Sequence, residues 1–77
     1  MKALSLFSGC GAMDLAAESA GIEIAGQCEI DKDCIKVLRH LWPGVLRWED
    51  VRALNAQSLE RKGVMPSEVD IIFGGFP

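Results

Sequence analysis

Four short apolar runs recur along the 77-residue chain, over residues 2–7, 22–29, 45–48 and 69–74. Apolar residues at helical spacing fill the first two intervals, over 12–20 and 31–42. A weaker helical pattern over 55–61 fills the third interval, with Gly63 and Pro66 close behind it. This alternation predicts an α/β fold, in which a Rossmann-like sheet of about four parallel strands is joined by right-handed crossover helices.

The two clearer helical patterns have recognisable ends. Gly21 follows the first, where the end of a helix commonly needs a positive φ. Asp31 is a suitable N-cap for the second, and Pro43 and Gly44 stop it. The first pattern carries small or apolar residues on one narrow face, made of Ala12, Leu15, Ala16, Ser19 and Ala20. The second carries such a face at Cys34, Ile35, Leu38, Leu41 and Trp42.

Length and charge limit what the chain does. A chain of 77 residues has room for one small core, and 49% apolar with 25% charged residues is typical of a folded globular domain. The net charge of −3 is mildly acidic, whereas a surface that binds phosphate backbones is usually basic. If DNA is involved, other residues must hold it.

The three cysteines, Cys10, Cys28 and Cys34, form neither an even disulfide set nor a C-x-x-C pair. We therefore expect no metal site and no disulfide framework, with each cysteine acting as a small apolar residue in a reducing compartment. No stretch approaches the ~20 apolar residues of a membrane span, so we expect a cytoplasmic protein without membrane contact.

The candidate site follows from the sheet. Ligands of open parallel sheets bind beyond the carboxyl ends of the strands. Four segments come there: the glycine turn 7–11, Glu29, Asp50 and the segment 74–77. Glu29 comes 18 residues after Gly11, a position suited to accepting hydrogen bonds from the hydroxyls of a ribose.

Each of these features also has a simpler interpretation. A G-x-G turn occurs between many strands and helices for geometric reasons alone. Glu29 and Asp50 taken singly are expected to be solvated loop acids, and Glu29 could belong to a cap network with Asp31. His40 is expected on the surface, and Trp42 and Trp48 in packing. The combination of segments is what indicates a cofactor that contains a nucleoside.

The kind of cofactor depends on Asp14. A dinucleotide turn usually has the pattern G-x-G-x-x-G, and Asp14 stands at its third glycine. A carboxylate near the start of the helix would also repel a pyrophosphate. S-adenosylmethionine has one adenosine, no phosphate and two positively charged groups, and is therefore the better match.

Four stretches resemble the DNA (cytosine-5) methyltransferase family. "LSLFSGCGAMDLAAESAGIE" resembles the first motif of that family, "CEIDKDCIKVLRHLWPG" the second, "EDV" the third and "DIIFGGFP" the start of the fourth. The resemblance covers the whole chain in the order and spacing of the family. Ala12 departs from it by standing where a glycine is usual, which should tighten the turn slightly without abolishing binding.

The resemblance implies the S-adenosylmethionine-dependent methyltransferase fold and a role for each matched residue. By resemblance, Phe7 packs on the cofactor, Ser8, Gly9 and Gly11 line its methionine part, Glu29 holds the ribose, Ile30 lies against the adenine, Asp50 and Val51 read the adenine edge, and Gly75, Phe76 and Pro77 lead to the reacting centre. In the family, a catalytic cysteine follows the proline. That thiolate attacks carbon 6 of a flipped cytosine and makes carbon 5 reactive toward the methyl group.

We therefore expect residues 1–77 to be the N-terminal, cofactor-binding part of a bacterial-type enzyme, of the kind found in restriction-modification, with no catalytic residue of its own. Alone it should be inactive. The remaining part should hold DNA, a second chain could complement the fragment, and the exposed fourth strand should promote self-association. A non-catalytic binding or assembly piece is the alternative, and a fragment of an NAD-dependent oxidoreductase is a more distant one.

Overall fold

The computed structural model describes residues 1–74, and it confirms the predicted α/β fold. Its elements are β1 (Lys2–Leu6), α1 (Ala12–Ser19), β2 (Glu23–Cys28), α2 (Lys32–Leu41), β3 (Leu46–Trp48), the 3₁₀ turn η1 (Val51–Ala53), α3 (Ala56–Arg61), the 3₁₀ turn η2 (Pro66–Glu68) and β4 (Ile71–Gly74). The four strands form one parallel sheet in the order β3-β2-β1-β4. Every predicted strand and helix is present, with ends shifted by one or two residues.

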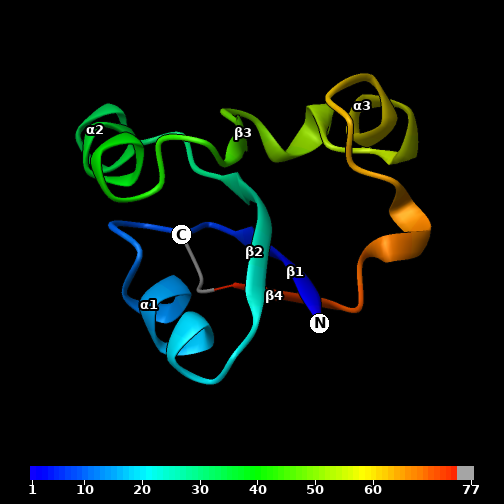
Figure 1. The fold of residues 1–77 in the computed structure, drawn as a ribbon. Coiled ribbons are helices and arrows are strands. Elements are labelled where there is room, and N and C mark those ends of the chain that lie inside the picture. The colour runs from blue at the N-terminus through cyan, green and yellow to red at the C-terminus, as the bar shows by residue number, and fades with distance from the viewer. Residues whose placement is uncertain (75–77) are drawn as a thin grey trace.

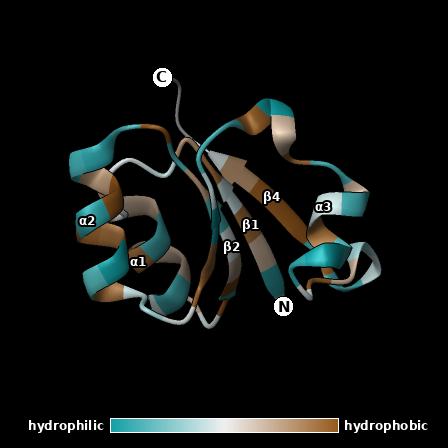
Figure 2. Cartoon of the chain, turned by 90° about the horizontal axis from the view of Figure 1, so that it is seen from above, coloured by the Kyte–Doolittle hydropathy of each residue, from teal (hydrophilic) through white to brown (hydrophobic). Residues whose placement is uncertain are grey.

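The helices cover both faces of the sheet. Helices α1 and α2 lie on one face and α3 lies on the other (Figures 1 and 2). The connections from β1 to β2 and from β2 to β3 move outward in one direction, whereas the connection from β3 to β4 returns past both inner strands. Right-handed crossovers in opposite directions place their helices on opposite faces. The order therefore reverses between β1 and β4, and ligands of such sheets bind beyond the carboxyl ends of the strands.

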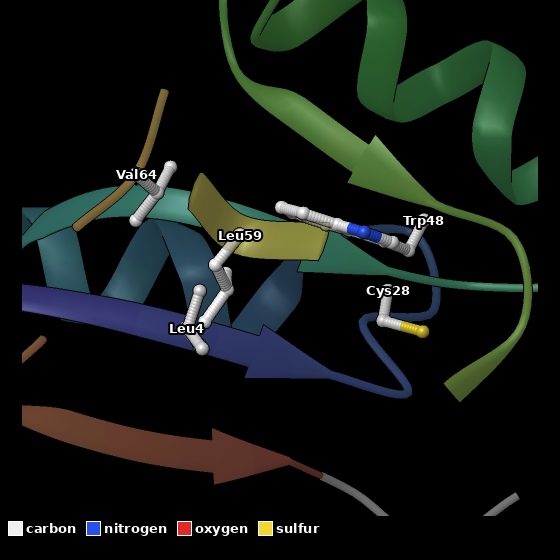
Figure 3. Close-up of a cluster of buried hydrophobic side chains, with 5 residues drawn as sticks. All are labelled: Leu4, Cys28, Trp48, Leu59 and Val64. Carbon is white, nitrogen blue, oxygen red and sulfur yellow. The ribbon is translucent and has the colours of Figure 1, made fainter. Parts of the chain in front are cut away.

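Each face of the sheet has its own apolar cluster. The cluster on the α3 face contains Leu4, Cys28, Trp48, Leu59 and Val64 (Figure 3). The cluster on the α1 face contains Ala3, Ala17 and Ile24. The predicted packing role of the tryptophans is confirmed, since Trp42 and Trp48 are only 6% and 5% exposed. His40 lies on the surface, as predicted.

The ends of α1 and α2 follow the sequence signals. Gly21 adopts φ 84°, and the Ile22 N–H donates to the Ala17 carbonyl at 3.0 Å, which closes the end of α1. Asp31 caps α2 by accepting the N–H groups of Asp33 and Cys34.

The face of small and apolar residues on α1 is not the face that the helix buries. The helix buries Asp14 and Ala17 instead, while Leu15 is 50% exposed. The other members of the predicted face, Ala12, Ala16, Ser19 and Ala20, are exposed as well. The physical reason is that Asp14 finds two buried hydrogen-bond partners on the sheet, and the helix turns its acidic residue toward them.

The predicted face of α2 is largely confirmed. Ile35, Leu38 and Trp42 are buried and Cys34 is half-buried, but Leu41 is 46% exposed. Within residues 1–74 no helix is long and apolar enough to cross a membrane.

Candidate functional site

The carboxyl ends of β1, β2 and β3 meet around a small cavity. Its volume is about 90 Å³, and its lining residues are Phe7, Cys28, Glu29, Ile30, Glu49, Asp50 and Val51. Five of these are predicted site residues that lie far apart in the sequence. The cavity combines carboxylates with exposed apolar side chains.

Glu29 stands at the centre of this edge and is tightly oriented. Its Oε1 accepts the Gly9 N–H at 2.7 Å, and its Oε2 accepts the N–H groups of Ile30 at 3.0 Å and Asp31 at 2.8 Å. The expected cap network with Asp31 is therefore real, but it is only part of the arrangement. The contact with Gly9 joins the end of β2 to the glycine turn after β1.

The same contacts limit what Glu29 can still accept. A carboxylate has about four lone-pair positions. Three backbone N–H groups use three of them. A ligand with two neighbouring hydroxyls therefore finds one position on Oε1, and gains another if the Gly9 N–H moves away.

Asp50 is held differently, by its own neighbour. Its carboxylate caps η1 by accepting the Arg52 N–H at 2.9 Å, and it pairs with the Arg52 guanidinium at 2.8 Å. The hydrogen bonds from the Arg52 side chain, then those from its backbone, hold the pKa of Asp50 below its ordinary value. Asp50 thus stays charged over a wide pH range, with a partner that is 87% exposed.

The glycine turn 7–11 has a strained backbone. Phe7 has φ 51°, and it is the one non-glycine residue with positive φ in the part of the chain that the structure describes. Such a conformation is uncommon for a bulky residue and concentrates at functional sites. Phe7 is 38% exposed and lines the cavity.

Three predicted residues of this turn do not line the cavity. The Ser8 hydroxyl points inward, within 2.9 Å of the Ser5 hydroxyl and donating to the Ser5 carbonyl at 3.0 Å. Gly11 packs on the ring of Trp42, where an added Cβ would come within 2.6 Å of a ring carbon. Gly9 touches the site through its N–H on Glu29. The contacts show that Ser8 and Gly11 help to shape the turn, and the predicted roles of Ser8, Gly9 and Gly11 at the methionine part of the cofactor stay predictions.

A buried polar network beneath the turn was not predicted. Asp14 is fully buried, and its two carboxylate oxygens accept the Ser5 hydroxyl at 2.7 Å and the Gln27 amide at 2.8 Å. Gln27 faces α1 because Ala25 is an extra residue in β2, opposite the step from Ala3 to Leu4, which shifts the alternation of side chains. The sequence contained a signal for this network, because Ser5 and Gln27 are polar residues inside two apolar runs.

Arg47 extends this network to α2. Its Nε donates to Gln27 at 2.9 Å, and its Nη2 donates to the carbonyls of Leu38, at 2.7 Å, and Trp42. Burial, and to a smaller degree the charge of Arg39, lowers the pKa of Arg47 from its ordinary value. The guanidinium therefore links β3 to β2 and to the end of α2.

The remaining predictions concern residues 75–77 and metal binding. Gly75, Phe76 and Pro77 lie outside the described residues, so their predicted roles stay predictions. Over residues 1–74, no group of three or more histidine, cysteine or acidic residues is arranged to hold a metal ion.

Comparison with known proteins matches the chain to a family. The model of the C-5 cytosine-specific DNA methylases matches residues 1–77. Relatives include the type II methyltransferases M.AquIA of Picosynechococcus sp. and M.NgoPII of Neisseria gonorrhoeae, each 38% identical over 99% and 100% of this chain. The chain spans 32% and 21% of their respective lengths.

Solved structures agree with this match. A putative DNA modification methyltransferase encoded within a prophage of E. coli superposes with a TM-score of 0.84 at 35% identity, covering 100% of this chain and 22% of that one. A mutant DNMT2 of Spodoptera frugiperda superposes with a TM-score of 0.78 at 26% identity, covering 99% of this chain and 22% of its own.

Proposed function

The chain belongs to the C-5 cytosine-specific DNA methylase family, and we propose that residues 1–77 form the S-adenosylmethionine-binding part of a DNA (cytosine-5) methyltransferase. The observation that carries the proposal is the position of Glu29. Its oriented carboxylate lies at the carboxyl edge of the sheet, between the glycine turn and a cavity bordered by Phe7, Ile30 and Asp50.

The chemistry of these residues fits the proposed ligand. Glu29 accepts hydrogen bonds from the ribose, and the exposed side chains of Phe7, Ile30 and Val51 offer apolar contact to the adenine. Asp50 supplies a second acceptor beside the base. When bound, S-adenosylmethionine supplies a methyl group activated by a sulfonium, and the acidic edge suits its positive charge. The roles of Gly75, Phe76 and Pro77 near the reacting centre belong to this proposal.

In this proposal, residues 1–77 bind the cofactor, and methyl transfer needs further residues. The whole protein methylates carbon 5 of cytosine in DNA, and further residues supply the nucleophile and the DNA-binding surface. The cysteines at hand lie in the glycine turn (Cys10), at the end of β2 (Cys28) and in α2 (Cys34), whereas the family places its nucleophile after β4. Residues 1–77 alone should therefore bind the cofactor and transfer no methyl group.

Calorimetry with S-adenosylmethionine and its demethylated product tests the binding site. We expect Glu29→Ala to lower the affinity by roughly 1.5 to 3 kcal/mol, since it removes charge-assisted hydrogen bonds. Asp33→Ala is the matched control, because it removes an exposed acid of the same charge from the first turn of α2. Equal affinity of the wild type and Glu29→Ala would contradict the role of Glu29. Binding of NAD in preference would favour an oxidoreductase, and binding of neither ligand would favour an assembly piece.

The edge of the sheet at β4 is proposed to pair with a further strand, from the rest of the protein, a complementing chain or a second copy. Ile72 is 62% exposed on this edge strand, whose outer backbone groups face no other strand among residues 1–74. Sedimentation should show concentration-dependent association, and Ile72→Lys should reduce it. A stable monomer at high concentration in the wild type would count against this surface.

A further inference from the structure

Cys10 and Cys34 meet beside the candidate site although 24 residues separate them. Their sulfur atoms lie 2.9 Å apart. Cys10 is exposed in the glycine turn, and Cys34 is half-buried in the first turn of α2. The third cysteine, Cys28, is 3% exposed in the core.

We propose that Cys10 and Cys34 form a redox-active dithiol, which a peroxide converts into a disulfide that fastens the glycine turn to α2 beside Glu29. The proposal uses chemistry that the methyl transfer does not require. It also changes the expectation from the sequence, in which the three cysteines were separate apolar residues.

The positions of the two sulfur atoms favour formation of a disulfide. A disulfide needs an S–S distance of about 2.05 Å, so the two sulfur atoms require a small approach and no change of fold. Backbone hydrogen bonds hold the two segments that carry Cys10 and Cys34. The Cys34 N–H donates to the Asp31 side chain at 3.0 Å, and the Gly11 N–H donates to the Ser8 carbonyl at 3.0 Å. The anchors keep the thiols facing each other.

The two thiols take different roles in the oxidation. The hydrogen bond with Cys10, followed by burial and the Cys10 charge, raises the pKa of Cys34 to about 12. Cys10 is exposed, so peroxide reaches its sulfur first, and we assign the attack on the peroxide to Cys10. One peroxide oxygen becomes a sulfenic acid on Cys10, and the other leaves as water after taking a proton.

The second step closes the bond. Oxidation of Cys10 removes the thiol hydrogen bond and the Cys10 charge that raise the pKa of Cys34. The Cys34 thiol gives up its proton and its sulfur attacks the Cys10 sulfur. The S–O bond breaks, and the hydroxyl takes that proton and leaves as a second water. Two thiols and one hydrogen peroxide thus give one disulfide and two waters, with both electrons passing to the peroxide.

The disulfide has a consequence for binding that rests on the proposed function. Gly9 precedes Cys10, and its N–H occupies the Oε1 of Glu29. Fastening Cys10 to α2 keeps this N–H in place and leaves one lone-pair position free for a ribose. Oxidation should therefore weaken binding of S-adenosylmethionine.

The disulfide is tested by mass spectrometry on the full chain. We expect hydrogen peroxide to remove the mass of two hydrogen atoms, and a peptide map after alkylation to show Cys10 linked to Cys34 with Cys28 alkylated only after unfolding. Cys10→Ser and Cys34→Ser should each abolish this product, and Cys34→Ser should accumulate the sulfenic acid. Absence of the link in the folded wild type, or a link that involves Cys28, would overturn the proposal.

The coupling to binding is tested separately. We expect the oxidised chain to bind S-adenosylmethionine about tenfold more weakly than the reduced chain, an effect the size of one hydrogen bond. Peroxide should leave the affinity of Cys34→Ser unchanged once a mild reductant has removed the sulfenic acid. Equal affinity of the oxidised and reduced forms would overturn the coupling. If the reduced chain binds no cofactor while the disulfide forms, the proposed function fails and the dithiol stands.

Discussion

Glu29 and Asp50 follow neighbouring strands of one sheet, and the two sides of the site are built differently around them. On the β1–β2 side, Glu29 is oriented by N–H groups from two separate segments, above the buried network of Asp14. On the β3 side, Asp50 is oriented by Arg52, two residues further along.

This difference separates contacts made by the fold from contacts made by the local chain. The β1–β2 side depends on β1, α1 and β2 being assembled, and the polar groups of its network, Ser5, Asp14 and Gln27, have little access to water. A buried polar group that loses its partner costs far more than an exposed ion pair, which water and salt screen. The β1–β2 side should therefore be rigid and sensitive to mutation, and the β3 side adaptable.

Asp14→Ala should have the largest effect on stability, because it removes the acceptor of the buried Ser5 hydroxyl and of the buried Gln27 amide. We expect a loss of about 2 to 4 kcal/mol in the free energy of unfolding, a large share of the total for a domain this small. Chemical denaturation followed by tryptophan fluorescence measures it. Asp50→Ala, the same change on the β3 side, should cost much less. Similar losses in both variants would remove the distinction between the two sides.

Gly11→Ala should come next, again on the β1–β2 side. Gly11 has φ 93°, and an added Cβ would lie 2.6 Å and 2.9 Å from carbons of the Trp42 ring. We expect a destabilisation of about 1 to 3 kcal/mol from overpacking, with a further cost for the left-handed backbone. Gly9→Ala is the matched control in the same turn, since a Cβ there meets nothing within 4 Å. Equal thermal shifts of the two variants would show that the contact with Trp42 carries no energy.

The order of elements could be predicted because it depends on local periodicity and on punctuation by residues such as Gly21 and Asp31. The inner face of α1 could not. Helical spacing placed Leu15 on the face of small and apolar residues, whereas the tertiary partners of Asp14 decided which face the helix buries.

The candidate site shows the same limit. Glu29, Asp50 and Phe7 were predicted at the correct edge because the carboxyl ends of parallel strands coincide. The inward hydroxyl of Ser8, the reach of Arg47 and the meeting of Cys10 with Cys34 depend on how separate elements pack. Residue spacing along the chain does not predict such contacts.

Arg52→Ala should have the smallest effect on stability, and it sharpens the comparison on the β3 side. Arg52 lowers the pKa of Asp50, so its contribution to folding is complete above the ordinary carboxyl pKa and is lost as the pH falls through the lowered value. We expect the variant to raise the titration midpoint of Asp50 toward the ordinary value in a carboxyl NMR titration, with the thermal midpoint at neutral pH almost unchanged. Arg61→Ala, which removes an exposed arginine from α3, should leave the Asp50 midpoint where it is. A large loss of stability in Arg52→Ala at neutral pH would mean that the fold depends on this ion pair, and the β3 side would then resemble the rigid side.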